Sequence, residues 1–88
     1  MANHASALKR ARQNEKRRDR NRAYRTRVRR AFKALDLAIE ENNPQTAAEL
    51  LKKAESIMDR AASKGVYHPR TASRKVSRLS KRLAAISA

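Results

Sequence analysis

Apolar residues recur at the period of an α-helix in three segments of the chain. Within each segment they are mostly spaced three or four residues apart, and no segment alternates with the period of two that a strand requires. The apolar positions are Val28, Ala31, Phe32, Leu35, Ala38 and Ile39; Ala47, Leu50, Leu51, Ala54, Ile57, Met58 and Ala61; and Ala72, Val76, Leu79, Leu83 and Ile86. The pattern predicts an all-α protein with three helices.

The only glycine and both prolines fall between these segments. Asn43 is expected to cap the second helix, with Pro44 at its first position. Gly65 is expected to end that helix, because glycine readily adopts the left-handed conformation. Pro69 then starts the third helix. These signals predict helices over roughly residues 6–42, 44–64 and 69–86.

The first predicted helix is longer than its apolar stripe. It is expected to start at a cap formed by Asn3 or Ser6, whereas the stripe begins only near Tyr24 or Val28. At about 1.5 Å per residue it would be about 54 Å long, against about 30 Å for each of the others. Short connections favour antiparallel neighbours. The sequence therefore predicts one domain over residues 1–88: a three-helix antiparallel bundle (residues 24–88) with a long basic N-terminal helical extension (residues 1–23).

Positive charge is concentrated in two regions. The chain has a net charge of +15 and a pI near 11.6. Residues 1–33 contain thirteen basic and two acidic residues, residues 34–63 three and six, and residues 64–88 seven and none. At about 100° per residue, the cations between residues 9 and 30 point in every direction around the helix. Charge on all sides predicts a rod placed between elements of folded nucleic acid.

The same segment contains like charges four residues apart, which repel each other along a helix. There are five such pairs: Arg12/Lys16, Lys16/Arg20, Arg18/Arg22, Arg25/Arg29 and Arg29/Lys33. Together they cost about 1–2.5 kcal/mol of helix stability. We therefore predict that residues up to about 22 are frayed in the free protein and become helical on their partner.

A second basic surface lies on the third predicted helix. Arg70, Arg74, Arg78 and Arg82 recur every four residues, opposite the apolar stripe, with Lys75 and Lys81 beside them. One face can pack while the other contacts phosphate. The acidic residues of the middle segment are expected to face solvent at the end of the bundle away from this surface: Asp36, Glu40, Glu41, Glu49, Glu55 and Asp59.

Composition argues against several other classes of protein. The chain has no cysteine, and neither His4 nor His68 has metal-ligand spacing. Glu40 and Glu41 are adjacent, so on a helix they diverge by about 100°, and no histidine accompanies them. We expect no enzyme activity, no cofactor and no metal. Tyr24 and Tyr67 could either stack on a base or pack against the bundle; Tyr67, at the Gly65 turn, is the better candidate for stacking.

The sequence fits membrane binding and DNA binding less well than RNA binding. No stretch approaches the roughly 18 apolar residues of a membrane span, and the basic segment lacks the apolar face that surface binding needs. A basic helix followed by an apolar stripe is also typical of leucine-zipper proteins. Here the stripe stops after Ile39, about two heptads, which is too short for a stable zipper. Folded RNA is favoured; the alternative is a basic helical DNA-binding or nucleoid-associated protein.

Two stretches resemble the bacterial small-subunit ribosomal protein S20 family. Residues 1–10 (MANHASALKR) are similar to the opening of that family. Residues 64–68 (KGVYH), followed by residues 71–75 (TASRK) and 78–79 (RL), are similar to its second signature. The resemblance covers essentially the whole chain, although Pro69 stands where a lysine is more usual.

The resemblance implies a non-catalytic protein that binds 16S ribosomal RNA, in the five-prime domain and at the long penultimate helix, early in assembly. It implies a cytoplasmic location in the ribosome. Expected partners are the RNA and few or no proteins, with no membrane, no small-molecule substrate and no homo-oligomer. The resemblance itself assigns RNA contacts to Asn3, Ser6, Lys9, Arg10, Lys16, Arg17, Asn21, Lys64, His68, Arg74 and Arg78. The two basic surfaces add Arg12, Arg20, Arg25, Arg29, Arg70, Lys75 and Arg82.

Overall fold

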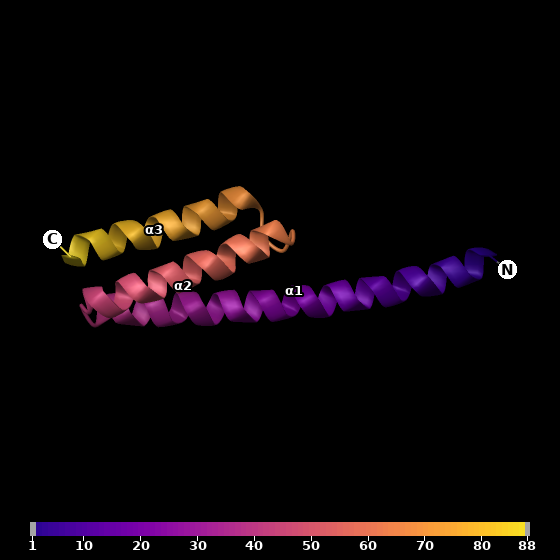
Figure 1. The fold of residues 1–88 in the computed structure, drawn as a ribbon, viewed down its shortest axis with the longest axis horizontal. Coiled ribbons are helices and arrows are strands. Elements are labelled where there is room, and N and C mark those ends of the chain that lie inside the picture. Colours follow the sequence, from indigo (N-terminus) through magenta and orange to yellow (C-terminus); the bar gives the residue numbers. More distant parts are fainter. Residues whose placement is uncertain (1, 88) are drawn as a thin grey trace.

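Three helices form an elongated antiparallel bundle, as the apolar spacing predicts (Figure 1). The computed structural model describes the backbone of residues 2–87 and the side chains of residues 4–87. Helix α1 comprises Ala2–Glu40, α2 comprises Pro44–Ser63 and α3 comprises Pro69–Ser87. Helix α2 runs back along the C-terminal half of α1, and α3 lies beside α2. The all-α prediction is confirmed.

The predicted limits of the first helix are wrong at both ends. Helix α1 already includes Asn3 and Ser6, so neither residue is its N-cap. The residues Ala2, Ala5 and Ala7 have the highest helix propensity, and nothing among them interrupts the helix. At the other end, Asn42 has a φ of 54° and therefore leaves the helix two residues earlier than expected.

The turn between α1 and α2 uses backbone hydrogen bonds to end one helix and a side chain to start the next. The amide of Asn42 donates to the carbonyl of Ile39, and that of Asn43 donates to the carbonyl of Ala38, both at 3.0 Å. These are the two bonds of a Schellman motif. Asn43 Oδ1 then accepts from the amide of Thr46 at 3.4 Å. The predicted cap at Asn43, with Pro44 in the first turn, is confirmed.

The second turn repeats this ending at the predicted glycine. Gly65 has a φ of 77°. Its amide donates to the Ala62 carbonyl at 3.0 Å, and the Val66 amide donates to the Ala61 carbonyl at 2.9 Å. Val66 is buried beside Ala61, which supplies the apolar contact that accompanies this motif. The turn fixes where α3 starts relative to the end of α2.

The core runs along the interface between α1 and α2. Ala47, Ala54 and Ala61 are fully buried and lie seven residues apart, so the two backbones approach closely along one seam of α2. Leu35, Val28 and Met58 are the largest fully buried side chains. They belong to two clusters, one near the α1–α2 turn and one near the α2–α3 turn.

The N-terminal half of α1 extends beyond α2 and α3 (Figure 1). The structure measures 66 × 20 × 14 Å, and its radius of gyration is 17.6 Å. A compact domain of this length would have a radius of gyration of about 12 Å. The difference reflects the projecting helix. Within the described residues, no helix is long and apolar enough to cross a membrane.

Candidate nucleic-acid interface

Residues 4–20 of α1, here called the rod, are exposed on every side. The rod carries seven basic residues and only two acidic ones, Glu15 and Asp19. Among residues 4–87 the one ion pair joins Arg82 to Asp36, at the far end of α1. The rod's cations therefore have no neutralising partner within the described chain, and they repel each other unless a polyanion surrounds them.

An arginine stripe continues from the rod along one face of α1. Arg18, Arg22, Arg25 and Arg29 follow the spacing four, three, four, which keeps them on one side of a helix. With Thr26 they line a hollow of about 560 Å³. Arginine clusters of this kind concentrate positive potential and suit phosphate groups. Arg25 and Arg29 were predicted as RNA ligands; Arg18 and Arg22 were missed, although their spacing was visible in the sequence.

Arg20 links the rod to the α2–α3 turn. Its Nη2 donates to the backbone carbonyl of Lys64 at 3.3 Å, across 44 residues of sequence, and to Oδ1 of Asn21 at 3.5 Å. The Lys64 carbonyl lies at the C-terminal end of α2, where the helix dipole is negative. From residue 4 onward, Asn21 is the first half-buried residue of α1. Arg20 thus has an intramolecular partner that sequence reasoning did not foresee.

The arginine row of α3 is exposed along its whole length. Its members differ in what they contact, because the row drifts around the helix by about 40° per step. Arg82 forms its ion pair with Asp36 of α1, with the two side chains 47% and 50% exposed. Arg70 and Arg74 form no ion pair within the described residues. Arg74 is therefore available to phosphate, whereas Arg82 is already paired.

His68 caps α3. Its Nδ1 accepts a hydrogen bond from the amide of Arg70 at 3.1 Å, and its carbonyl accepts from the amide of Ala72 at 3.1 Å. Acceptance at Nδ1 requires the neutral ring with its proton on Nε2. The Nε2–H group is then the one donor that the exposed ring offers to a ligand. His68 thus starts the helix, a role in addition to the RNA contact predicted for it from the sequence.

A groove between α1 and α3 has a volume of about 410 Å³. It is lined by four cationic side chains, one carboxylate and two apolar side chains, one of which is an aromatic ring. These residues are Phe32, Lys33, Asp36, Lys75, Arg78, Leu79 and Arg82. Lys75 Nζ lies 5.9 Å from the ring centre of Phe32 and 5.8 Å from that of Tyr67. Phe32 was expected to be a core residue, but it is only half-buried. Lys33 was missed.

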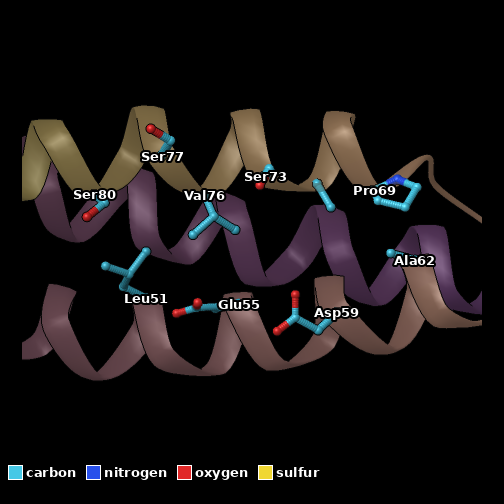
Figure 2. Close-up of a pocket in the computed structure, with 10 residues that line it drawn as sticks. Leu51, Glu55, Asp59, Ala62, Pro69, Ser73, Val76, Ser77 and Ser80 are labelled. Atoms are coloured by element: carbon cyan, nitrogen blue, oxygen red, sulfur yellow. The ribbon is translucent and has the colours of Figure 1, made fainter.

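A second groove, between α2 and α3, has the opposite character (Figure 2). Its volume is about 460 Å³. Glu55 and Asp59 of α2 line it on one side, and Ser73, Ser77 and Ser80 of α3 line it on the other. Among the described residues, no group of three His, Cys, Asp or Glu side chains could hold a metal ion.

All six acidic residues of the middle segment were expected to face solvent at the end of the bundle away from the basic surface, and only half of them do so. Glu40, Glu41 and Glu49 are exposed at or near the α1–α2 turn. Asp36 contacts Arg82, and Glu55 and Asp59 lie along α2 within the groove of Figure 2. The prediction was wrong for Glu55 and Asp59 because α2 runs along the length of the bundle, so residues spread along its sequence are spread along the bundle (Figure 1).

The predicted ligands fall on two surfaces that diverge from the α2–α3 turn. The side chain of Asn3 lies outside the described ones. Asn21 is half-buried and all other predicted ligands are exposed. The rod and the adjoining face of α1 hold Ser6, Lys9, Arg10, Arg12, Lys16, Arg17, Arg20, Asn21, Arg25 and Arg29. The turn and α3 hold Lys64, His68, Arg70, Arg74, Lys75, Arg78 and Arg82.

Comparisons with a family profile and with individual relatives identify the same family. Residues 2–84 match the sequence profile of the family described as Ribosomal protein S20. A relative named Small ribosomal subunit protein bS20, from Syntrophobacter fumaroxidans, is 59% identical over 86 residues, which cover 98% of this chain and 100% of the relative. Proteins of the same name from Desulfatibacillum aliphaticivorans (49% identical, 99% of each chain) and Gluconobacter oxydans (52% identical, 99% of this chain and 98% of the relative) are also similar.

Proposed function

Because this chain belongs to the ribosomal protein S20 family, and hence to the small ribosomal subunit in the cytoplasm, we propose that it binds 16S ribosomal RNA directly. We further propose that it contacts the five-prime domain and the penultimate helix and stabilises their fold during assembly. The observation that carries this proposal is the rod, whose seven cations have no ion-pair partner within the described chain.

The arrangement of the two basic surfaces supports simultaneous contact with separate RNA elements. The rod leaves the bundle near the α2–α3 turn, while the α3 row runs along the bundle itself (Figure 1). A structure 66 Å long and only 14 Å thick can reach between packed helices of RNA. Phosphates on several sides of the rod would neutralise charges that otherwise repel each other.

The division at residue 23 follows from the same charge distribution. We propose that residues 1–23 act as a helical extension that depends on RNA for its stability, while residues 24–88 fold without it. Residues 4–20 bury no side chain, so only local helix formation favours their order, and like charges oppose it. The contact of Arg20 with Lys64 is the last tether before the helix leaves the bundle.

The chain acts as a monomer with few direct protein contacts, and it needs no cofactor, small-molecule substrate or catalytic residue. The RNA ligands are the basic residues of the rod, the arginine stripe and the arginine row of α3. They also include Asn3, Ser6, Asn21, Lys64, His68 and Lys75. Arg82 contributes least among them, since Asp36 already neutralises it.

A competition experiment tests this function. The full chain is titrated against a transcript of the 16S five-prime domain, with and without excess duplex DNA, at several salt concentrations. Binding should survive the competitor, and affinity should fall by about 10³–10⁵ between 50 and 200 mM salt if six to ten phosphates are contacted. Equal affinity for DNA would instead support the DNA-binding or nucleoid-associated alternative.

A further inference from the structure

The groove between α1 and α3 combines features that a purely structural crevice does not need. Phe32 packs against both core clusters, so its ring is held in place, yet it remains half-buried and lines the groove. Leu79 forms the apolar part of the opposite wall, on α3. A rigid aromatic ring beside an open groove offers a surface for stacking.

The charges around this ring are nearly all positive. Lys33, Lys75, Arg78 and Arg82 line the groove with one carboxylate, Asp36, which leaves a net charge of +3. Arg82 neutralises Asp36, while Lys33, Lys75 and Arg78 have no ion-pair partner within residues 4–87. An anionic ligand is therefore favoured, and the three unpaired cations are long enough to reach groups at the rim of the groove.

Lys75 is placed so that it can move toward such a ligand. Its ammonium is near the outer limit of about 6 Å for a cation–π contact with each ring, Phe32 and Tyr67. An exposed contact of this kind is worth only about 0.5–1 kcal/mol. A phosphate oxygen of the ligand can therefore replace this weak cation–π contact as the partner of the Lys75 ammonium.

The groove also continues the arginine stripe of α1. The stripe follows the spacing four, three, four from Arg18 to Arg29, and the next two steps of three and four reach Phe32 and Asp36. A nucleic-acid strand that places its phosphates on this stripe is therefore led to the groove along the same face of the helix.

We propose that the α1–α3 groove binds one unstacked nucleotide of the 16S ribosomal RNA, an inference that depends on the function proposed above. Its base stacks on Phe32 and contacts Leu79, and its flanking phosphates contact Lys33 and Arg78. A volume of about 410 Å³ lies within the range of small-ligand sites, about 300–1,000 Å³. Single-stranded bases are the parts of RNA that proteins bind by stacking on aromatic side chains.

The test compares Phe32→Leu with Phe32→Tyr for binding to the five-prime-domain transcript. Loss of stacking should weaken binding by about 5- to 150-fold with Phe32→Leu, while Phe32→Tyr retains it. The slope of log affinity against log salt should not change with either variant, because no phosphate contact is removed. With Arg78→Gln the slope should decrease by about 0.7–0.9.

Two further measurements keep the test independent of folding. Ile86→Ala, which removes a half-buried side chain of the first cluster outside the groove, controls for lost packing, and circular dichroism reports the folded fraction. Ultraviolet irradiation of the wild-type complex should crosslink a nucleotide to Phe32. The nucleotide site is refuted if wild-type protein binds the transcript normally but Phe32→Leu loses no more affinity than Ile86→Ala and no crosslink forms.

Other outcomes separate this inference from the function on which it depends. If wild-type protein does not bind the transcript at all, the proposed function fails, and the groove with it. If Phe32→Leu weakens binding only when other small-subunit proteins are present, the groove holds a protein side chain and the nucleotide site is wrong.

Discussion

Two leucines of α1 allow the packing of the bundle to be tested with a matched pair of substitutions. Leu35 is 0% exposed and belongs to the cluster near the α1–α2 turn, whereas Leu37, two residues later, is 55% exposed. Each is changed to alanine, so the chemical change and the helix propensities are the same. Only the environment differs.

The expected effects differ by several kcal/mol. Leu35→Ala removes buried methyl groups and leaves a cavity, which costs about 2–5 kcal/mol. Leu37→Ala should change the free energy of unfolding by no more than about 0.5 kcal/mol. A bundle of this size has a total stability of about 3–10 kcal/mol, so Leu35→Ala removes a large fraction of it and can leave no folded baseline.

Urea unfolding followed by circular dichroism measures both values. With a slope of about 1 kcal/mol per molar urea, Leu35→Ala should lower the midpoint by at least about 2 M, and Leu37→Ala by less than about 0.5 M. Similar shifts for the two variants would refute the assignment of one face of α1 to the core.

Three further predictions concern the turn, the RNA surface and the ion pair. Gly65→Ala should lower the urea midpoint by the equivalent of about 1–2 kcal/mol, because alanine is strained at a φ of 77°. No atom lies within 4 Å of the added Cβ, so this backbone strain is the only cost. An unchanged midpoint would contradict the assigned turn. Arg74→Gln should leave the circular dichroism spectrum unchanged and decrease the salt slope of RNA binding by about 0.7–0.9, and an unchanged slope would remove Arg74 from the interface. A double-mutant cycle of Asp36→Asn and Arg82→Gln should give a coupling of no more than about 1 kcal/mol, since both side chains are about half exposed; a coupling above 2 kcal/mol would show that this pair holds α3 in place.

The three helices and their joints could be predicted because the signals are local. Apolar spacing identifies the faces that pack, and Asn43, Pro44 and Gly65 act on their own backbone or on that of the next turn. The end of α1 was misplaced because Asn42 adopts a left-handed conformation that its sequence permits but does not require.

The relation between α1 and α3 could not be predicted in the same way. Phe32 continues the apolar stripe, so its spacing indicates a core residue. Its actual exposure depends on how α3 lies over the α1–α2 pair, which no local signal fixes. The same is true of the ion pair between Asp36 and Arg82, which are 46 residues apart. The exposure of the rod was predictable, since a helix without an apolar stripe has nothing to bury.

The central claim is that RNA surrounds the rod, and the absence of native cysteine makes a direct measurement possible. Leu8→Cys, Gln13→Cys and Asn14→Cys place single thiols on three sides of the rod, roughly 100–140° apart, without removing a cation. Each thiol carries a tethered iron chelate, and the hydroxyl radicals that it generates cleave nearby RNA in the small subunit. We predict cleavage of 16S ribosomal RNA from all three positions, at different nucleotides. Cleavage from one position only, or from none, would contradict the account.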